Sequence, residues 1–186
     1  MGSAKKLRKK FENPKKLWDE TRLKEEKQLV EEYGLKNMRE LWKAQTILRK
    51  LRRDARRLLS GKGAKLEERA ERLITRCKKY FINKDDLKIE DILGLKVTDL
   101  LERRLQTIIW RKHLGVTPKM SRQIIIHGHI AIDESKVSIP SYIVSFSEES
   151  KLNWFGKPVS IQMLEKKVST ETPKKEEVVA SEVKSE

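Results

Sequence analysis

The chain has 186 residues, enough for one or two modest domains, and its 43 Lys and Arg against 28 Asp and Glu give a formal net charge of +15. Charged residues make up 38% of the chain and apolar residues 37%, so the core is small or part of the chain lies against a partner. Because so many like charges repel one another in a compact fold, we expect a polyanion as partner, and nucleic acid is the most common one. An anionic membrane surface is the alternative.

Several other classes of protein are excluded. No apolar run approaches the roughly 18 residues of a membrane span, and the first residues, MGSAKKLRKKF, lack the apolar core of a secretory signal. A single cysteine, Cys77, excludes an internal disulfide framework and favours a reducing compartment. We therefore expect a cytoplasmic protein with no membrane partner.

Residues 1–16 are predicted to form a basic arm. The first 60 residues hold 19 basic and 9 acidic side chains, so the cationic surplus is concentrated in the first third of the chain. The segments KKLRKK and NPKK have no apolar periodicity, which is typical of a disordered arm that orders on RNA; a solvated tail without a ligand is the alternative. The cations expected to contact RNA here are Lys5, Lys6, Arg8, Lys9 and Lys10.

Residues 17–98 are expected to form a helical domain with short connections. A first helix is predicted over 17–33, with Gly34 at the position of a C-terminal cap. A third helix is predicted over 64–81, and the connector over 85–96 contains one short apolar element.

The second helix of this half carries the clearest pattern in the chain. Asn37 and Glu40 have the spacing of a capping box at its start, and Gly61 ends it. Its apolar stripe, at alternating spacings of three and four, consists of Leu41, Ala44, Leu48, Leu51, Ala55 and Leu58. The densest basic run of the chain occupies its other faces, with Arg49, Lys50, Arg52, Arg53, Arg56 and Arg57. Such crowding of cations favours contact with phosphates; a solvated basic helix is the alternative.

Residues 99–164 are expected to form a small α+β domain, with two short helices packed on an antiparallel sheet. Thr98 is predicted to cap a helix over 99–113. Thr117 is predicted to cap a second helix, with Pro118 at its first position, where a missing N–H costs nothing.

The predicted strands follow that second helix, which ends near Ile126. Alternating apolar residues predict strands at 130–132 and 137–139, joined by a turn at 133–135. Further strands are predicted at 143–146 and 159–164, and the tail over 165–186 is expected to be disordered.

Two features of this half suit phosphate binding. The start of the helix at Thr117 offers free N–H groups and a partial positive charge to an anion, with Lys119 and Arg122 beside it. Arginine binds phosphate through two parallel hydrogen bonds, and the preceding helix supplies Arg103, Arg104 and Arg111.

The pair His127 and His129 around Gly128 raises the question of a metal. Zinc needs three or four ligands, and only His113 and Cys77 remain as further His or Cys partners, so we expect no metal. A histidine near phosphate and a structural, hydrogen-bonding histidine are the two alternatives. Gly128 is expected to supply a backbone conformation that other residues avoid.

The four tryptophans, Trp18, Trp42, Trp110 and Trp154, suit either of two roles. They can stack on bases, but near leucines at helical spacing core packing is expected. No phosphate loop, nucleophile elbow, zinc-protease pair or dinucleotide fingerprint is present. We therefore expect no enzyme, no cofactor and no small-molecule substrate.

The second half resembles the RNA-binding domain named after small-subunit ribosomal protein S-four. The matching segment is ERRLQTIIWRKHLGVTPKMSRQIIIHGHIAIDESKVSIPSYIV. It departs from the family's pattern at Gln106, at Pro118 and at the turn Asp133-Glu134-Ser135, which puts a phosphate contact at 118 in doubt.

The first half is similar to the N-terminal region of the same ribosomal protein in its archaeal and eukaryotic form. The most specific part is Tyr33-Gly34-Leu35, followed by Asn37, Arg39-Glu40 and Trp42. The resemblance implies a structural, ribosome-bound protein that binds a helix junction in the 5′ domain of small-subunit ribosomal RNA early in assembly. It also implies neighbouring ribosomal proteins near the messenger entry region and an influence on decoding accuracy.

Two other classes carry the same small domain. RNA-modifying enzymes need a further catalytic domain, and residues 1–98 are too helical and basic to provide one. Stand-alone RNA-binding factors are usually short and lack such a helical region.

Overall fold

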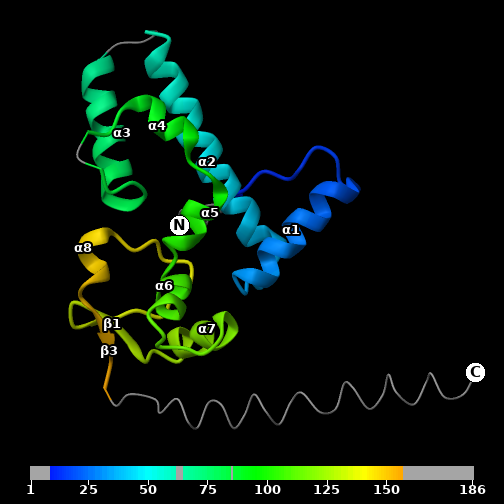
Figure 1. The fold of residues 1–186 in the computed structure, drawn as a ribbon, viewed down its shortest axis with the longest axis vertical. Helices are drawn as coiled ribbons and strands as arrows, with labels where there is room; N and C mark the ends of the chain where they lie inside the picture. Colours follow the sequence, from blue (N-terminus) through cyan, green and yellow to red (C-terminus); the bar gives the residue numbers. More distant parts are fainter. Residues whose placement is uncertain (1–8, 62–64, 85, 157–186) are drawn as a thin grey trace, which may run out of the picture.

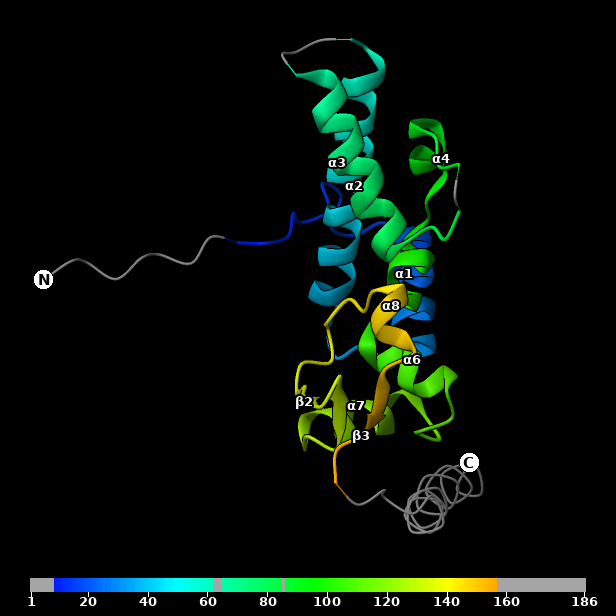
Figure 2. The ribbon, with the colours of Figure 1, turned by 90° about the vertical axis from the view of Figure 1, so that its left-hand side faces the viewer.

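A computed structural model describes residues 9–61, 65–84 and 86–156 of the chain. Figure 1 shows a helical part, in blue to green, and a small α+β part in green to orange. The hairpin of α2, Met38–Leu59, and α3, Leu66–Tyr80, extends away from the three-stranded sheet, which lies at the other end of the molecule in Figure 2. The predicted α+β class, with a small antiparallel sheet, is confirmed.

The first helix, α1, spans Glu20–Glu32 and begins three residues later than predicted. It ends in a Schellman motif, because the N–H of Leu35 donates to the carbonyl of Val30 and that of Gly34 to Glu31. Gly34 has φ of +58°, a conformation that glycine adopts at little cost. The predicted C-terminal cap is therefore confirmed.

The helical core is built on α2, Met38–Leu59, whose predicted stripe is buried from Leu41 to Ala55, with Leu58 half-buried. Against it pack α3, Leu66–Tyr80, and α4, Ile89–Gly94. Asn37 occupies the N-cap of α2, but its side chain makes no cap hydrogen bond, so the predicted capping box is wrong. The carboxylate of Glu40 bonds to two arginines instead.

The single helix predicted over 99–113 is wrong, because the structure has two helices there. They are α5, Val97–Glu102, and α6, Leu105–Arg111. The chain breaks between them because Arg104 pairs with Ile143 in an antiparallel bridge. The N–H of Leu105 donates to Tyr142, and the carbonyl of Arg103 accepts from Val144. Lys96, not Thr98, is the N-cap of α5.

The sheet has strand order β2-β1-β3, with both pairs antiparallel. The strands are β1, Ile130–Ile132, β2, Ser135–Lys136, and β3, Leu152–Trp154. The two turn residues Asp133 and Glu134 have φ of +50° and +69°, as a two-residue hairpin with a type I′ turn requires. The turn keeps this conformation without the glycine that usually favours it.

The strand predictions outside 130–132 are only partly right. Val137 follows β2 and donates its N–H to Ile130, but no strand reaches 139. Residues 143–146 form the bridge to Arg104 and the start of α8, Phe146–Glu149. The third strand is β3, which no alternating pattern predicted. The strand predicted at 159–164 and the tail at 165–186 lie outside the described residues.

The core of the α+β part lies between the sheet, α6 and α7, Pro118–Ile126. It contains the apolar residues Leu105, Ile109, Ile125, Ile130 and Val144, all fully buried. No helix within the described ranges is long and apolar enough to cross a membrane.

Candidate RNA-binding surface

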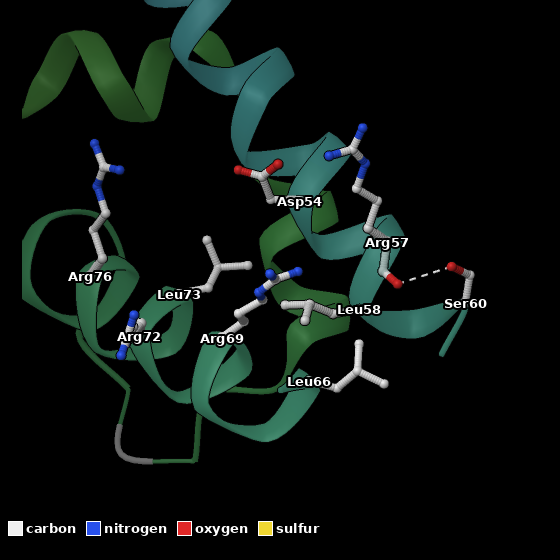
Figure 3. Close-up of a pocket in the computed structure, with 9 residues that line it drawn as sticks. All are labelled: Asp54, Arg57, Leu58, Ser60, Leu66, Arg69, Arg72, Leu73 and Arg76. Carbon is white, nitrogen blue, oxygen red and sulfur yellow. Dashed lines mark hydrogen bonds between the residues drawn. The ribbon is translucent and has the colours of Figure 1, made fainter. Parts of the chain in front are cut away.

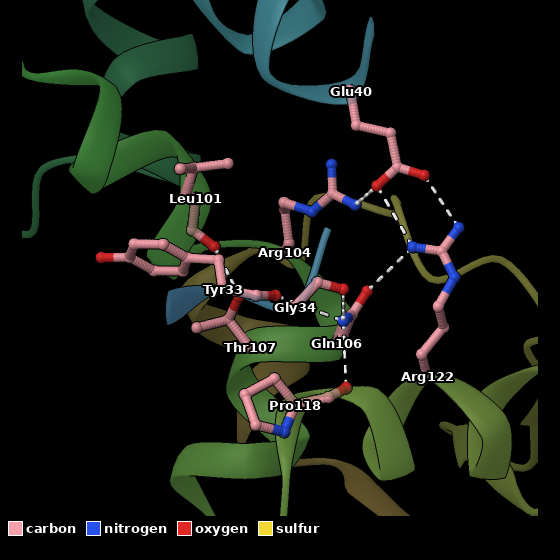
Figure 4. A network of polar contacts seen from close by, with 9 residues as sticks. All are labelled: Tyr33, Gly34, Glu40, Leu101, Arg104, Gln106, Thr107, Pro118 and Arg122. Atoms are coloured by element: carbon pink, nitrogen blue, oxygen red, sulfur yellow. Dashed lines mark hydrogen bonds and ion pairs between the residues drawn. The ribbon is translucent and has the colours of Figure 1, made fainter. Parts of the chain in front are cut away.

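Glu40 at the start of α2 joins the helical part to the α+β part (Figure 4). One carboxylate oxygen accepts from Arg104 at 2.8 Å, and the other accepts from Arg122 at 2.8 Å. Burial raises the pKa of the Glu40 carboxyl, but the hydrogen bond from Arg122 and the charges of both arginines outweigh it, so the pKa lies below its ordinary value. The carboxylate therefore stays charged and holds one arginine of α7 and one that precedes α6.

Gln106 completes this junction, as Figure 4 also shows. Its side chain is fully buried, and Nε2 lies within hydrogen-bond distance of the carbonyls of Tyr33, Gly34 and Pro118. Its Oε1 accepts from Arg122. Gln106, one of the positions that depart from the family's pattern, thus connects the end of α1 to the start of α7.

The arginines predicted to bind phosphate in the α+β part have mostly internal partners. Arg104 is buried against Glu40. Arg103 pairs with Glu149 at 2.7 Å, with its guanidinium over the ring of Phe146. Arg111 pairs with Glu102, but its side chain remains half exposed. Of the Lys and Arg residues predicted to contact RNA in this part, Arg111 and Lys119 are the exposed ones.

The start of α7 has the predicted cap. Thr117 Oγ1 accepts from the N–H of Met120 at 3.2 Å, and Pro118 occupies the first helical position. A Cβ added to Gly34 would lie 2.7 Å from the Cβ of Pro118, so the loop after α1 packs against this end of the helix. Gly34 is required there for its close approach as well as for its positive φ.

His127 is exposed and His129 half-buried, with ring centroids 6.5 Å apart. Gly128 has φ of +76°, as predicted, and the Lys136 side chain crosses it. Burial raises the pKa of Cys77 to about 11, so this thiol stays protonated in the core of the helical part. Across residues 9–61, 65–84 and 86–156, no three His, Cys, Asp or Glu side chains gather to hold a metal ion.

The basic run on α2 divides into cations with partners and cations without. Arg49 pairs with Glu12, and Arg52 donates to the carbonyl of Leu95. Arg53 lies 3.6 Å from Asp54, a weak and exposed pair. The guanidinium of Arg56 donates only to a backbone carbonyl one turn back. Within the described chain, the Lys50 and Arg57 side chains have no partner, and both are exposed.

A groove of about 580 Å³ runs between α2 and α3 near the end of the hairpin (Figure 3). Its apolar floor consists of Leu58, Leu66 and Leu73. Its rim carries the arginines Arg57, Arg69, Arg72 and Arg76, with Asp54 as the one acidic residue. Four arginines from two helices thus line this one groove.

The three arginines of α3 were not predicted as site residues. Arg69, Arg72 and Arg76 are all exposed, and Arg72 lies 3.6 Å from Glu68. Their spacing of three and four places them on one face of α3. This spacing is visible in the sequence and indicates a basic helix face. The three acidic residues of the same helix obscured it, because they reduce the charge of its five Lys and Arg residues to +2.

The predicted basic arm is described from Lys9 onward and has no helix or strand as far as 16. It lies against α2, where Phe11 packs on Trp42 at 6.1 Å between ring centroids and the N–H of Glu12 donates to Thr46. Lys9 lies over the Phe11 ring, and Lys10 is exposed. Lys5, Lys6 and Arg8 lie outside the described residues.

Comparison with known proteins matches both parts of the chain. A family model described as the S4 domain matches residues 103–150. The small ribosomal subunit protein uS4 of Methanothermobacter thermautotrophicus is 44% identical over 155 residues, which cover 83% of this chain and 91% of the relative. That of Sulfurisphaera tokodaii is 45% identical over 156 residues, 83% of this chain and 88% of the relative. The alignments are three times as long as the S4 domain match, so they include much of the helical part.

Proposed function

Because the chain belongs to the small ribosomal subunit protein uS4 family, we propose that it is a structural component of the small ribosomal subunit. It binds the RNA of that subunit through its S4 domain and its helical part. It acts as a ribosomal protein in translation and not as an enzyme.

The observation that carries the RNA-binding mechanism is the arginine-lined groove between α2 and α3. Arg57, Arg69 and Arg76 are exposed, and within the described ranges their guanidinium groups have no carboxylate partner. A guanidinium that is not paired in the protein retains its full attraction for phosphate, and each phosphate contact releases counterions from the RNA. These cations therefore supply affinity, which is strongest at low salt.

The junction at Glu40 fixes the position of the helical part relative to the α+β part. Arg104 and Arg122 are tied to Glu40, and Gln106 is tied to the carbonyls of Gly34 and Pro118. The groove at one end and the exposed Lys119 and Arg111 at the other are thus held at a fixed distance. Two basic surfaces at a fixed distance suit the shape of two RNA helices that converge, since the deep groove of such helices admits no side chains.

The finer role follows the family. We place the binding site at a helix junction in the 5′ domain of the small-subunit RNA, with binding early in assembly. The bound protein would lie beside other ribosomal proteins near the messenger entry region, contribute to decoding accuracy, and act in the cytoplasm.

Equilibrium binding to separate transcripts tests this role. The purified protein is titrated with a transcript of the 5′ domain and, as a control, with a transcript of another domain of the same RNA and similar length. We expect tighter binding to the 5′ domain by at least tenfold at physiological salt. Equal affinity for both transcripts, or release of the protein from small subunits in a moderate salt wash, would contradict the proposal.

A further inference from the structure

Trp18 is the tryptophan that the described fold does not use. Its side chain is 92% exposed. Trp42 packs on Phe11 and donates to Glu26, and Trp154 packs against the core of the sheet. Trp110 is half-buried, with the guanidinium of Arg111 over its ring. An apolar ring that remains in water costs free energy, so the exposure of Trp18 indicates that a ligand covers this ring.

The backbone beside Trp18 is held in place. Arg22 Nη2 donates to the carbonyls of Lys16 and Leu17 at 3.0 Å each, and Arg22 Nη1 donates to Glu26 at 2.7 Å. The Glu26 side chain is buried and also accepts from Trp42 and Gln45. The buried Glu26 carboxylate thus holds Arg22, and Arg22 holds the backbone just before Trp18. The exposed position of the indole is therefore a stable feature of the structure.

The charges around Trp18 favour an anionic ligand. Lys15 and Lys16 are exposed, and neither has a partner in the part of the chain that the structure describes. Of the two acids that follow, Glu20 pairs with Lys24 at 2.6 Å, and Asp19, which accepts from the neutral Thr21 hydroxyl, keeps its charge. Lys15 and Lys16 against Asp19 still leave a surplus of one positive charge. The ligand therefore meets an exposed aromatic ring, and two exposed lysines lie two and three residues before it in the chain.

We propose that Trp18 is a stacking platform for an unpaired base of RNA, with Lys15 and Lys16 on the phosphates beside that base. A planar base fits the indole face, and its phosphates supply the charge that the two lysines lack. The inference rests on the proposed function and adds a class of ligand to it, a single-stranded nucleotide in place of a duplex backbone. The preformed loop lowers the entropy cost of binding.

Tryptophan fluorescence and affinity test this role with two probes, a single-stranded oligouridylate and an RNA duplex of the same length. We expect the oligouridylate to quench the emission of the wild-type protein, and Trp18→Phe to remove most of that quenching. Trp18→Ala should weaken oligouridylate binding by about 5- to 150-fold, the range for loss of one stacked base, and Trp18→Phe by less. Binding of the duplex should hardly change.

Trp110→Phe is the matched control, because the fold already uses that ring, and it should keep the oligouridylate affinity of the parent. Urea unfolding of Trp18→Ala should match the parent, since the side chain is exposed. Unchanged oligouridylate affinity in Trp18→Ala would overturn the inference, as would quenching by a neighbouring ribosomal protein and not by RNA. With either of these results, the proposed function still stands if Trp18→Ala binds the 5′-domain transcript. If the wild-type protein does not bind that transcript, the proposed function and this inference are both overturned.

Discussion

At the scale of single residues, the roles of the arginines follow from their distance to a carboxylate. Arg104 and Arg122 lie at hydrogen-bond distance from Glu40 and hold the two parts of the chain together. Arg69 and Arg76 have no such partner among the described residues and face water. The same side chain therefore stabilises the fold in one place and is free for phosphate in the other.

Gln106 is expected to be the most sensitive uncharged residue at the junction. Gln106→Ala leaves the carbonyls of Gly34 and Pro118 buried without the side-chain donor, and we expect a loss of about 1–3 kcal/mol in the free energy of unfolding. Gln123→Ala, at an exposed position of α7, is the matched control and should change it little. Urea unfolding of the two variants measures the difference, and equal stability would refute the role given to Gln106.

Glu40 is expected to make stability depend on pH in the acid range. Its pKa is lowered in the folded state, so the charged carboxylate stabilises the protein fully above the unfolded value of about 4.3. This contribution is lost as the pH falls through the folded value. Glu40→Gln should therefore cost about 1.5–3 kcal/mol at neutral pH, and the gap to the wild type should narrow below about pH 4.3. Urea unfolding across this range measures the gap; a gap that stays constant would contradict the assignment.

At the scale of elements, capping residues decide where the short helices of the α+β part begin. Thr117 caps α7 through its hydroxyl, whereas the Thr98 hydroxyl donates to the side chain of Asp99 and does not cap α5. Replacing each threonine by alanine removes the same hydroxyl and methyl group, but only one of the two replacements also removes a helix cap. Comparing the two variants therefore isolates the effect of the cap.

Thr117→Ala should lower the free energy of unfolding by about 1 kcal/mol, because an N–H of α7 loses its acceptor. Thr98→Ala is the control and should lower it by less. Thermal or urea unfolding decides between them. If the two variants unfold alike, the cap at Thr117 does not have the energetic weight assigned to it.

The elements also show what local sequence patterns can and cannot predict. The stripe of α2 and the cap of α7 depend on residues within one or two turns, so both were predicted correctly. The break between α5 and α6 depends on Ile143, about 40 residues away, which pairs with Arg104. No local pattern contains that bridge, and the helical spacing of Leu101, Leu105, Ile108 and Ile109 favoured one helix.

At the scale of the whole molecule, two surfaces are held apart by one junction. The α2–α3 hairpin, whose far end carries the groove, lies at one end and the sheet of the α+β part at the other (Figure 2). The family and the basic helix were predictable from the sequence. The burial of Arg104 was not, because its partner Glu40 is far away in the chain.

The salt dependence of RNA binding tests the central claim, that unpaired arginines of the α2–α3 groove neutralise ribosomal RNA. The measurement compares the wild type with the variant Arg57→Gln, Arg69→Gln and Arg76→Gln on the 5′-domain transcript. A control loses the same charge elsewhere, through Lys24→Gln, Lys27→Gln and Lys151→Gln. We expect the slope of log affinity against log salt to fall in the groove variant by up to about 0.9 for each lost phosphate contact, with little change in the control. Equal slopes for the groove variant and the wild type would contradict the claim.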